Sequence, residues 1–245
     1  MKAASGILGL AFLATCLLVN SRTVYLALDP LLGGGNALYL TVQLTWVLAM
    51  FFMKVAFVPD ERTSHGRRRF FLPDVWVLLT FITLITGFFF LSSMPETAYR
   101  VAPYRTEWTV IAFTQLVNIY SAGCAILIVK NSLTLIKVTH RPRARRIGFA
   151  ALCAGFSLGL ITFMERIVLA PFSPSMSNET RTLVETIDGG IVLSTTLFIV
   201  VGFLLLAIGN AQRGSKPVNE TPPSNWNSAT HPKVTAIRMA DRSQQ

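Results

Sequence analysis

The chain has 245 residues, of which 52% are hydrophobic and 14% are charged. A soluble domain carries about 25% charged residues, and here the apolar residues form blocks of about twenty, the length that crosses a hydrocarbon core. The composition therefore excludes an ordinary soluble domain, although the length alone would allow one. Because backbone polar groups in lipid must bond to one another, each apolar block is predicted to be a helix.

Six such blocks predict an all-α, polytopic transmembrane helix bundle within residues 1–209, with spans at about 4–19, 37–58, 75–94, 108–129, 147–169 and 189–208. The first span is the shortest and can extend toward Leu28. Its opening, Lys2 before an apolar stretch and small residues, also resembles a signal peptide. Cleavage would leave five spans, whereas a retained helix fits the charge pattern better. The triplet 33–35 is Gly-Gly-Gly and predicts a turn.

The basic residues are unevenly distributed along a chain whose formal net charge is +10. Seventeen of the 22 Lys and Arg residues lie at the N-terminus, in segments 54–74 and 130–146, and in the tail, and the alternate loops hold the other five. Positive loops face the cytoplasm, so both termini are predicted to be cytoplasmic in a bacterial plasma membrane. Seven of the 12 acidic residues fall on the opposite, outer side: Asp29, Glu96, Glu107, Glu165, Glu179, Glu185 and Asp188.

The tail after the last span has a different composition. Residues 210–245 are rich in Asn, Pro, Ser and Thr, including Pro222 and Pro223. Such a segment buries too little apolar surface to offset its ordering entropy. It is predicted to be a disordered cytoplasmic tail.

Glu165 and Arg166 are the first candidates for a solute or proton site. They lie late in the fifth predicted span, where ionisable side chains usually face the bundle interior or a wet cavity. Glu165 can bind a proton, a cation or a solute there. Alternatively, both side chains reach the outer headgroups and only anchor the helix.

The fourth predicted span carries a polar stripe. Thr114, Asn118 and Ser121 share one helix face, with Gln115 beside it. In apolar surroundings, amide side chains find partners on other helices, such as Gln43 of the second span or residues 194–196 of the sixth. The stripe indicates either a polar cavity for a solute or interhelical hydrogen bonding alone.

Small residues recur in the fifth predicted span. Ala151, Gly155 and Gly159 follow one another at four-residue intervals, a spacing that lets two helices approach closely. We expect packing within the bundle rather than dimerisation.

A basic segment precedes the fifth span. Its residues are Lys137, Arg141, Arg143, Arg145 and Arg146. They can contact anionic membrane lipids or an acidic cytoplasmic regulatory protein, or they can serve only as a topology signal. Nucleic-acid binding is not expected, because no recognition module accompanies the charge.

The residues of common catalytic and metal sites are missing from the spans. The three histidines, His65, His140 and His231, lie outside them, and the three cysteines lie inside them without a metal-ligand spacing. The chain is therefore predicted not to be an enzyme and to need no cofactor or metal.

Several segments resemble a known group of proteins. They are Thr23-Val24-Tyr25 through Asp29 with the glycine loop after it, and the segments 145–150, 185–187 and 202–209. Together they are similar to a poorly characterised group of actinobacterial multi-pass membrane proteins, loosely labelled as transporters and often encoded near helix-turn-helix regulators. The resemblance implies a transporter-like membrane protein and assigns no binding or catalytic residue.

Two functional hypotheses follow from these patterns. The first is a small-solute transporter-like protein with a polar cavity between the second, fourth, fifth and sixth spans. The second is a non-transporting accessory or signalling subunit that recruits a cytoplasmic partner. Neither the solute nor the oligomeric state is defined by the sequence.

Overall fold

A computed structural model of the chain describes residues 2–57, 71–94, 96–98, 104, 106–137, 143–169, 172 and 177–214. These residues form α1 (Lys2–Val19), α2 (Arg22–Leu28), the 3₁₀-helix η1 (Pro30–Leu32), α3 (Ala37–Phe57), α4 (Phe71–Phe90), α5 (Trp108–Lys137), α6 (Arg143–Leu169) and α7 (Asn178–Gly214). No strand occurs among them. The predicted all-α fold is confirmed.

Five stretches within the described helices are long and apolar enough to cross a membrane: Ala37–Phe57, Pro73–Phe90, Trp108–Lys137, Arg143–Leu169 and Thr186–Gly209. A sixth span is present if the pair Ala4–Val19 and Arg22–Leu32, bent by 85°, counts as one. The chain is therefore a polytopic membrane bundle. A straight extension of the first span toward Leu28 is wrong, because the chain turns sharply after Val19 and Ser21 starts α2 in an extended conformation.

Several helices differ in length from the predicted spans, and α4 begins at Phe71 and ends at Phe90 rather than covering 75–94. The helix α5 continues to Lys137 and α6 begins at Arg143, so both carry basic residues past the apolar blocks. The helix α7 runs from Asn178 to Gly214 and takes up residues 210–214 of the predicted tail. The rest of the predicted tail, residues 215–245, lies outside the described residues.

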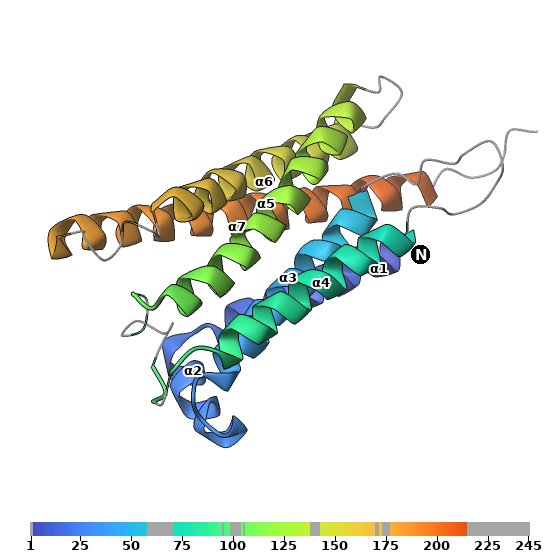
Figure 1. Cartoon of the computed structure of the whole chain (residues 1–245). Helices are drawn as coiled ribbons and strands as arrows, with labels where there is room; N and C mark the ends of the chain where they lie inside the picture. Colours follow the sequence, from blue (N-terminus) through green and yellow to red (C-terminus); the bar gives the residue numbers. More distant parts are fainter. Residues whose placement is uncertain are drawn as a thin grey trace, which may run out of the picture.

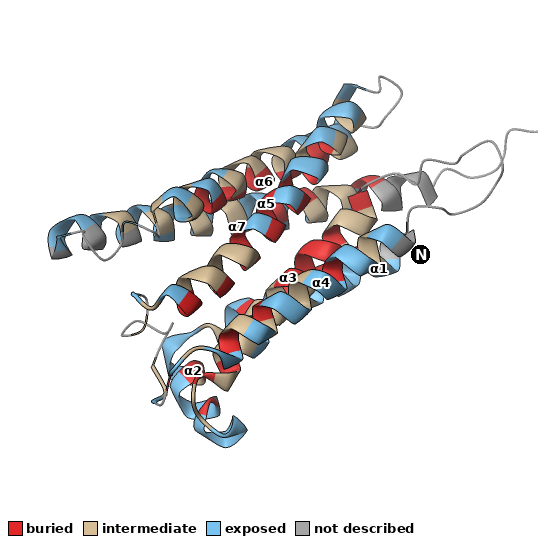
Figure 2. Cartoon of the chain, viewed as in Figure 1, coloured by how far each residue is buried: buried red, intermediate tan, exposed pale blue. Residues whose placement is uncertain are grey.

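The helices α3 and α5 occupy the middle of the bundle (Figure 1), with α1 packed on α3, α6 on α5, and α7 on α6. Figure 2 shows buried residues gathered on α3 and α5, whereas α7 is mostly exposed. Half of the residues in the most apolar stretch of α5 are buried, compared with only 11% in the most apolar stretch of α7. Toward the α2 end, the α6–α7 pair diverges from α1 and α3 (Figure 1). Most of the surface of α7 is therefore left to lipid.

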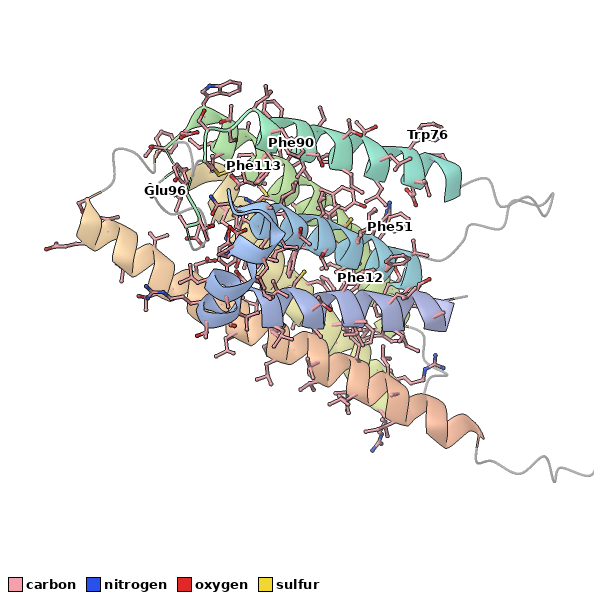
Figure 3. All side chains as sticks on the ribbon, turned by 90° about the horizontal axis from the view of Figure 1, so that it is seen from below. Phe12, Phe51, Trp76, Phe90, Glu96 and Phe113 are labelled. Carbon is pink, nitrogen blue, oxygen red and sulfur yellow. The ribbon has the colours of Figure 1, made fainter. Side chains whose placement is uncertain are left out.

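Aromatic rings fill the space between the central helices. Phe113 of α5 is fully buried, and its ring centroid lies 5.8 Å from that of Tyr39 and 5.9 Å from that of Phe89. Figure 3 shows Trp76 and Phe90 toward opposite ends of α4; they are 65% and 75% exposed. In hydrocarbon this exposure has little cost, since lipid tails are as apolar as the rings.

A left-handed turn joins η1 to α3 and confirms the turn expected from the glycine triplet. Gly33, Gly34, Gly35 and Asn36 have φ angles of 99°, 70°, 61° and 61°. Glycine adopts this conformation without a steric penalty, and Asn tolerates it better than most residues. The turn places Asn36 directly before α3.

A buried carboxylate holds this turn together. Asp29 has no exposed surface and accepts hydrogen bonds from the backbone N–H of Asn36 (3.1 Å), the backbone N–H of Leu38 (2.8 Å) and the Thr97 hydroxyl (2.5 Å). The Leu38 donor lies in the first turn of α3 and the Asn36 donor lies at the residue directly before it, where negative charge also opposes the helix dipole. Asp29 therefore bonds α3 to the segment after α4.

Asn36 extends the same contact. Its side-chain nitrogen donates to the Glu96 carbonyl at 2.8 Å, and its side-chain oxygen accepts from the Ala98 N–H at 2.8 Å and the Tyr25 hydroxyl at 3.1 Å. Figure 3 shows Glu96 at this end of the bundle. We call Tyr25, Asp29, Asn36 and Thr97 the corner cluster. It fixes α2 and residues 96–98 over the end of α3.

Glycines bring α6 and α7 close together. A Cβ on Gly155 would lie 3.0 Å from the Ile199 side chain and 3.2 Å from its backbone nitrogen, and one on Gly159 would lie 3.4 Å from Thr195 Cγ2. On the facing helix, a Cβ on Gly202 would lie 3.0 Å from the Gly148 carbonyl oxygen. The prediction that these small residues pack within the bundle is confirmed.

An ion pair links α3 and α4 at the end opposite the corner cluster. Lys54 Nζ lies 2.7 Å from Asp74 Oδ1. The sequence placed Lys54 both in the second predicted span and at the start of the basic segment 54–74, and Asp74 at the end of that segment. In the structure Lys54 is in the last turn of α3 and Asp74 is in the first turn of α4. Each charge opposes the dipole of its own helix end, and the pair joins α4 to the bundle.

The contact at Gly202 gives a stability prediction. Gly202→Ala is expected to lower the free energy of unfolding by about 1–3 kcal/mol, because the new Cβ would lie 2.6 Å from Leu152 Cγ. Thermal unfolding of purified protein in detergent measures the change. Gly123→Ala on α5 is the matched control, since no atom lies within 4 Å of its Cβ position. Equal melting temperatures for the two variants would contradict the close α6–α7 contact.

Candidate functional site

The residues through which α6 and α7 contact each other change from small and apolar to polar along the two helices. On α6 the stripe runs Gly155, Gly159, Thr162 and Arg166, at the four-, three- and four-residue spacing of a single helix face. On α7 the facing positions include Asp188, Thr195, Ile199 and Gly202. Toward Gly202 the contact is small and apolar, and toward Asp188 it is polar. We call the polar part, with Gln115 of α5, the polar seam.

An ion pair closes the polar seam at the α2 end. Arg166 Nη2 lies 2.6 Å from Asp188 Oδ2, and the two side chains are 44% and 22% exposed. Arg166 is in the last turn of α6, where a positive charge opposes the helix dipole. Asp188 Oδ1 is buried and has no hydrogen-bond partner among the described residues. One carboxylate oxygen is thus paired and the other is free.

Gln115 of α5 caps the end of α6. Its side-chain nitrogen donates to the carbonyl oxygens of Arg166 at 3.0 Å and Ile167 at 3.5 Å. These carbonyls lie in the last turn of α6 and have no partner within the helix, so the amide supplies one. The amide oxygen of Gln115 is buried without a partner in the described part of the chain. The cap therefore leaves one acceptor free at the polar seam.

Many hydroxyl groups elsewhere in the bundle donate a hydrogen bond to a backbone carbonyl close to them in sequence. Their oxygen atoms donate to the carbonyl four residues earlier, which is the usual behaviour of Ser and Thr in apolar surroundings. Among the described residues, Ser92, just after α4, does so to the Phe88 carbonyl, and eight hydroxyls within helices do the same: Thr15, Thr41, Thr45, Thr80, Thr114, Thr134, Ser194 and Thr196.

Two hydroxyls of the polar seam do not follow this pattern. The oxygen atoms of Thr162 and Thr195 are buried and have no partner within the described ranges, and Thr162 is only 2% exposed. Ser132 of α5 is the third such hydroxyl, away from the seam. A buried unpaired polar group costs about 1–3 kcal/mol. The unpartnered hydroxyls therefore mark the seam as a place where a polar ligand or water would be stabilised.

The sequence-predicted site residues are only partly brought together. Arg166 and Gln115 belong to the polar seam, whereas Glu165 is half-buried on the adjoining face of α6 and has no ion pair with another described residue. Asn118 is 8% exposed on α5, and Gln43 is half-buried on α3. The role expected for Glu165 stays a prediction.

The polar stripe of α5 makes a different interhelical contact from those expected. Ser121 accepts a hydrogen bond from the Trp46 indole at 3.0 Å, and the Trp46 ring packs edge-on against Phe163. Thr114 bonds to its own helix at the Val110 and Ile111 carbonyls. The stripe therefore joins α5 to α3 through an indole rather than an amide.

Sequence reasoning missed Asp188 and Thr162 as site residues, and named Thr195 only among residues 194–196, as a partner for the polar stripe of the fourth span. Asp188 was assigned to the outer loop because the apolar block was read from residue 189, although the span begins at Thr186. The two threonines look ordinary in sequence, since other threonines of the spans bond within their helices. One available signal was the spacing of Gly155, Gly159, Thr162 and Arg166, which continues the small-residue stripe into polar positions.

The basic segment lies at the opposite end of α6. Lys137, Arg143 and Arg146 are exposed, whereas Arg145 is half-buried with its side chain directly against Gly209 of α7. Arg141 lies outside the described residues. Three of the five predicted contact residues are therefore accessible, and Arg145 packs between helices.

In the described part of the chain, no three His, Cys, Asp or Glu side chains are placed to hold a metal ion. Comparison with models of known protein families, with curated proteins and with solved structures found no match.

The ion pair of the polar seam can be tested by a double-mutant cycle. Arg166→Gln and Asp188→Asn are each expected to destabilise the protein, and the double variant less than their sum, with a coupling of about 0.5–1 kcal/mol because both side chains are partly exposed. Thermal unfolding of the four proteins gives the coupling. A cycle between Arg166 and the exposed Glu96 is the control. Strict additivity at Arg166 and Asp188 would show that the pair does not form.

Proposed function

We propose that the chain is a small-solute transporter-like protein of a bacterial plasma membrane, with the α2 end facing outward and both termini in the cytoplasm. The observation that carries the proposal is the set of buried, unpartnered oxygen atoms at the polar seam: Gln115 Oε1, Thr162 Oγ1, Asp188 Oδ1 and Thr195 Oγ1. Within a membrane, ionisable and polar groups of this kind usually line a solute or ion pathway.

The position of the seam supports the same function. It lies between α6 and α7, and α7 is the least buried of the five long spans. Toward the α2 end the α6–α7 pair diverges from α1 and α3 (Figure 1), while Gln115 of α5 still bonds to the end of α6, and Arg166 at that end is 44% exposed. A solute arriving from the α2 end would first meet the Arg166–Asp188 pair and then the two threonine hydroxyls.

A permeability assay tests the proposal. Full-length protein in liposomes is expected to speed the entry of at least one of glycerol, glycine, methylammonium and lactate, followed by light scattering after osmotic shock. Asp188→Asn and Thr162→Val are each expected to lower that permeability about tenfold, equivalent to about 1.4 kcal/mol, because each removes a polar group of the seam.

The controls use residues matched in chemistry. Thr114→Val removes a hydroxyl that already bonds within α5 and is expected to leave permeability unchanged. Glu165→Gln separates the two acidic candidates, since unchanged flux would remove Glu165 from the pathway. Entry rates equal to those of protein-free liposomes for all four solutes would overturn the proposal.

The exposed basic side chains favour a second function, an accessory or signalling subunit that recruits a cytoplasmic partner. Lys137 and Arg143 end and begin adjacent helices, and Arg146 lies on the same helix as Arg143. Three exposed cations near one end of the bundle suit an acidic protein surface or anionic lipid. The resemblance to the actinobacterial group, whose genes neighbour regulators, agrees with this alternative without testing it.

Affinity purification in mild detergent tests the second function. A stoichiometric soluble partner is expected to be lost when Arg143 and Arg146 are both changed to Gln, because both side chains are exposed and charged. A C-terminal reporter must show that the orientation of the variant is unchanged, since these residues also set topology. Lys130→Gln, an exposed charge two turns before the end of α5, is the control. Purification of the chain without any stoichiometric partner would reject this alternative.

A further inference from the structure

The free atoms of the polar seam are all oxygens, and this restricts what can bind there. Asp188 Oδ1 and Gln115 Oε1 only accept hydrogen bonds, and the hydroxyls of Thr162 and Thr195 accept as readily as they donate. Two donors nearby are already used: the Gln115 amide nitrogen on the α6 carbonyls and Arg166 Nη2 on Asp188 Oδ2. The other N–H groups of the Arg166 guanidinium belong to a side chain that is 44% exposed. A ligand that satisfies the seam must bring positive charge or hydrogen-bond donors.

The charged residues around the seam also favour a ligand that carries positive charge. Arg166 and Asp188 compensate each other, and the half-buried Glu165 adds a negative charge one residue away. In the sequence, the stretches predicted to lie on the outer side hold seven acidic residues against five basic ones. Fields of this sign raise the local concentration of cations and repel anions.

The geometry limits the size of the ligand. Asp188 and Thr195 are seven residues apart on one helix face, which is about 10 Å along α7. The stripe is one residue wide, and a Cβ on Gly159 would already be in contact with Thr195. The seam is a narrow row of acceptors rather than one large cavity, so a bulky solute does not fit between the helices.

We infer that the polar seam binds a compact monovalent cation, either an alkali metal ion or a small protonated amine, with Asp188 Oδ1 as its principal ligand and the Thr162 hydroxyl as a secondary one. The Thr195 hydroxyl, about 10 Å farther along α7, is the next acceptor of the row. This inference rests on the proposed function, because it names the class of solute that the same site takes. Gln115 contributes its free amide oxygen while its nitrogen continues to cap α6.

Thermal unfolding of the purified full-length protein tests the inference. Sodium, potassium or methylammonium chloride is expected to raise the melting temperature in a saturable manner relative to N-methyl-D-glucamine chloride at equal ionic strength, because a ligand that binds only the folded state stabilises it. A shift with methylammonium alone assigns the site to an amine. A shift with sodium or potassium assigns it to an alkali metal ion. Either result supports the inference.

Variants connect the shift to the seam. Asp188→Asn is expected to weaken the apparent cation affinity at least tenfold and Thr162→Val about threefold. The matched controls, Glu96→Gln for the carboxylate and Thr114→Val for the hydroxyl, are expected to leave it unchanged, since Glu96 is exposed and Thr114 bonds within its own helix. Gel filtration must show that each variant is folded and monodisperse. If Asp188→Asn is not, the Thr162→Val and Thr114→Val pair decides.

The remaining outcomes would overturn the inference. One is an equal melting temperature in all four salts. Another is stabilisation that follows the anion, seen as a larger shift with sodium lactate than with sodium chloride. If liposomes still admit glycerol or glycine in a manner that depends on Asp188, the cation assignment fails and the transporter-like function stands. If no solute enters either, both fail.

Discussion

A polar group in a hydrocarbon environment must find its partner within the protein, and this constraint organises the whole bundle. Among the described residues, eight hydroxyls meet it locally by bonding to their own helix, and Gln115 meets it by capping α6. The corner cluster meets it through a fully buried carboxylate that receives three hydrogen bonds. The polar seam stands out because several of its oxygen atoms lack such partners. The polar seam therefore differs from the rest of the bundle in its incomplete hydrogen bonding rather than in its residue types.

The close approach of α6 and α7 determines where the unpartnered atoms lie. Gly155 and Gly202 each leave room for a side chain of the facing helix, Ile199 and Leu152 respectively, so the two helices approach closely. This contact fixes the register of the antiparallel pair, so that Arg166 faces Asp188 and Gly159 faces Thr195. A shift of α7 by one turn would separate the ion pair. Packing in the apolar part of the α6–α7 contact thus determines which polar groups face each other in the polar seam.

Much of the fold could be predicted from the sequence, because apolar blocks of membrane-spanning length allow few alternatives to helices. The packing of Gly155 and Gly159 within the bundle could also be predicted. The bend after Val19 could not, since it depends on a corner in which Asp29 and Asn36 bond to residues about sixty positions later. The pairs Lys54–Asp74 and Arg166–Asp188 were missed for a related reason. Each joins two different helices, and the pattern of a single helix contains no information about the register of its neighbour.

The length of α7 has a consequence for the membrane around the protein. Its apolar stretch, Thr186–Gly209, has 24 residues, which is about 36 Å of helix for a hydrocarbon core about 30 Å thick. A helix that is too long for the bilayer tilts, and the tilt grows as the bilayer becomes thinner. Since little of α7 is buried against protein, the lipids have direct access to it. A mismatch between this stretch and the bilayer therefore favours tilting of α7. The helix is held against α6 at Gly202 and carries Asp188 near the other end of its apolar stretch. The thickness of the bilayer is thereby coupled to the distance across the Arg166–Asp188 ion pair.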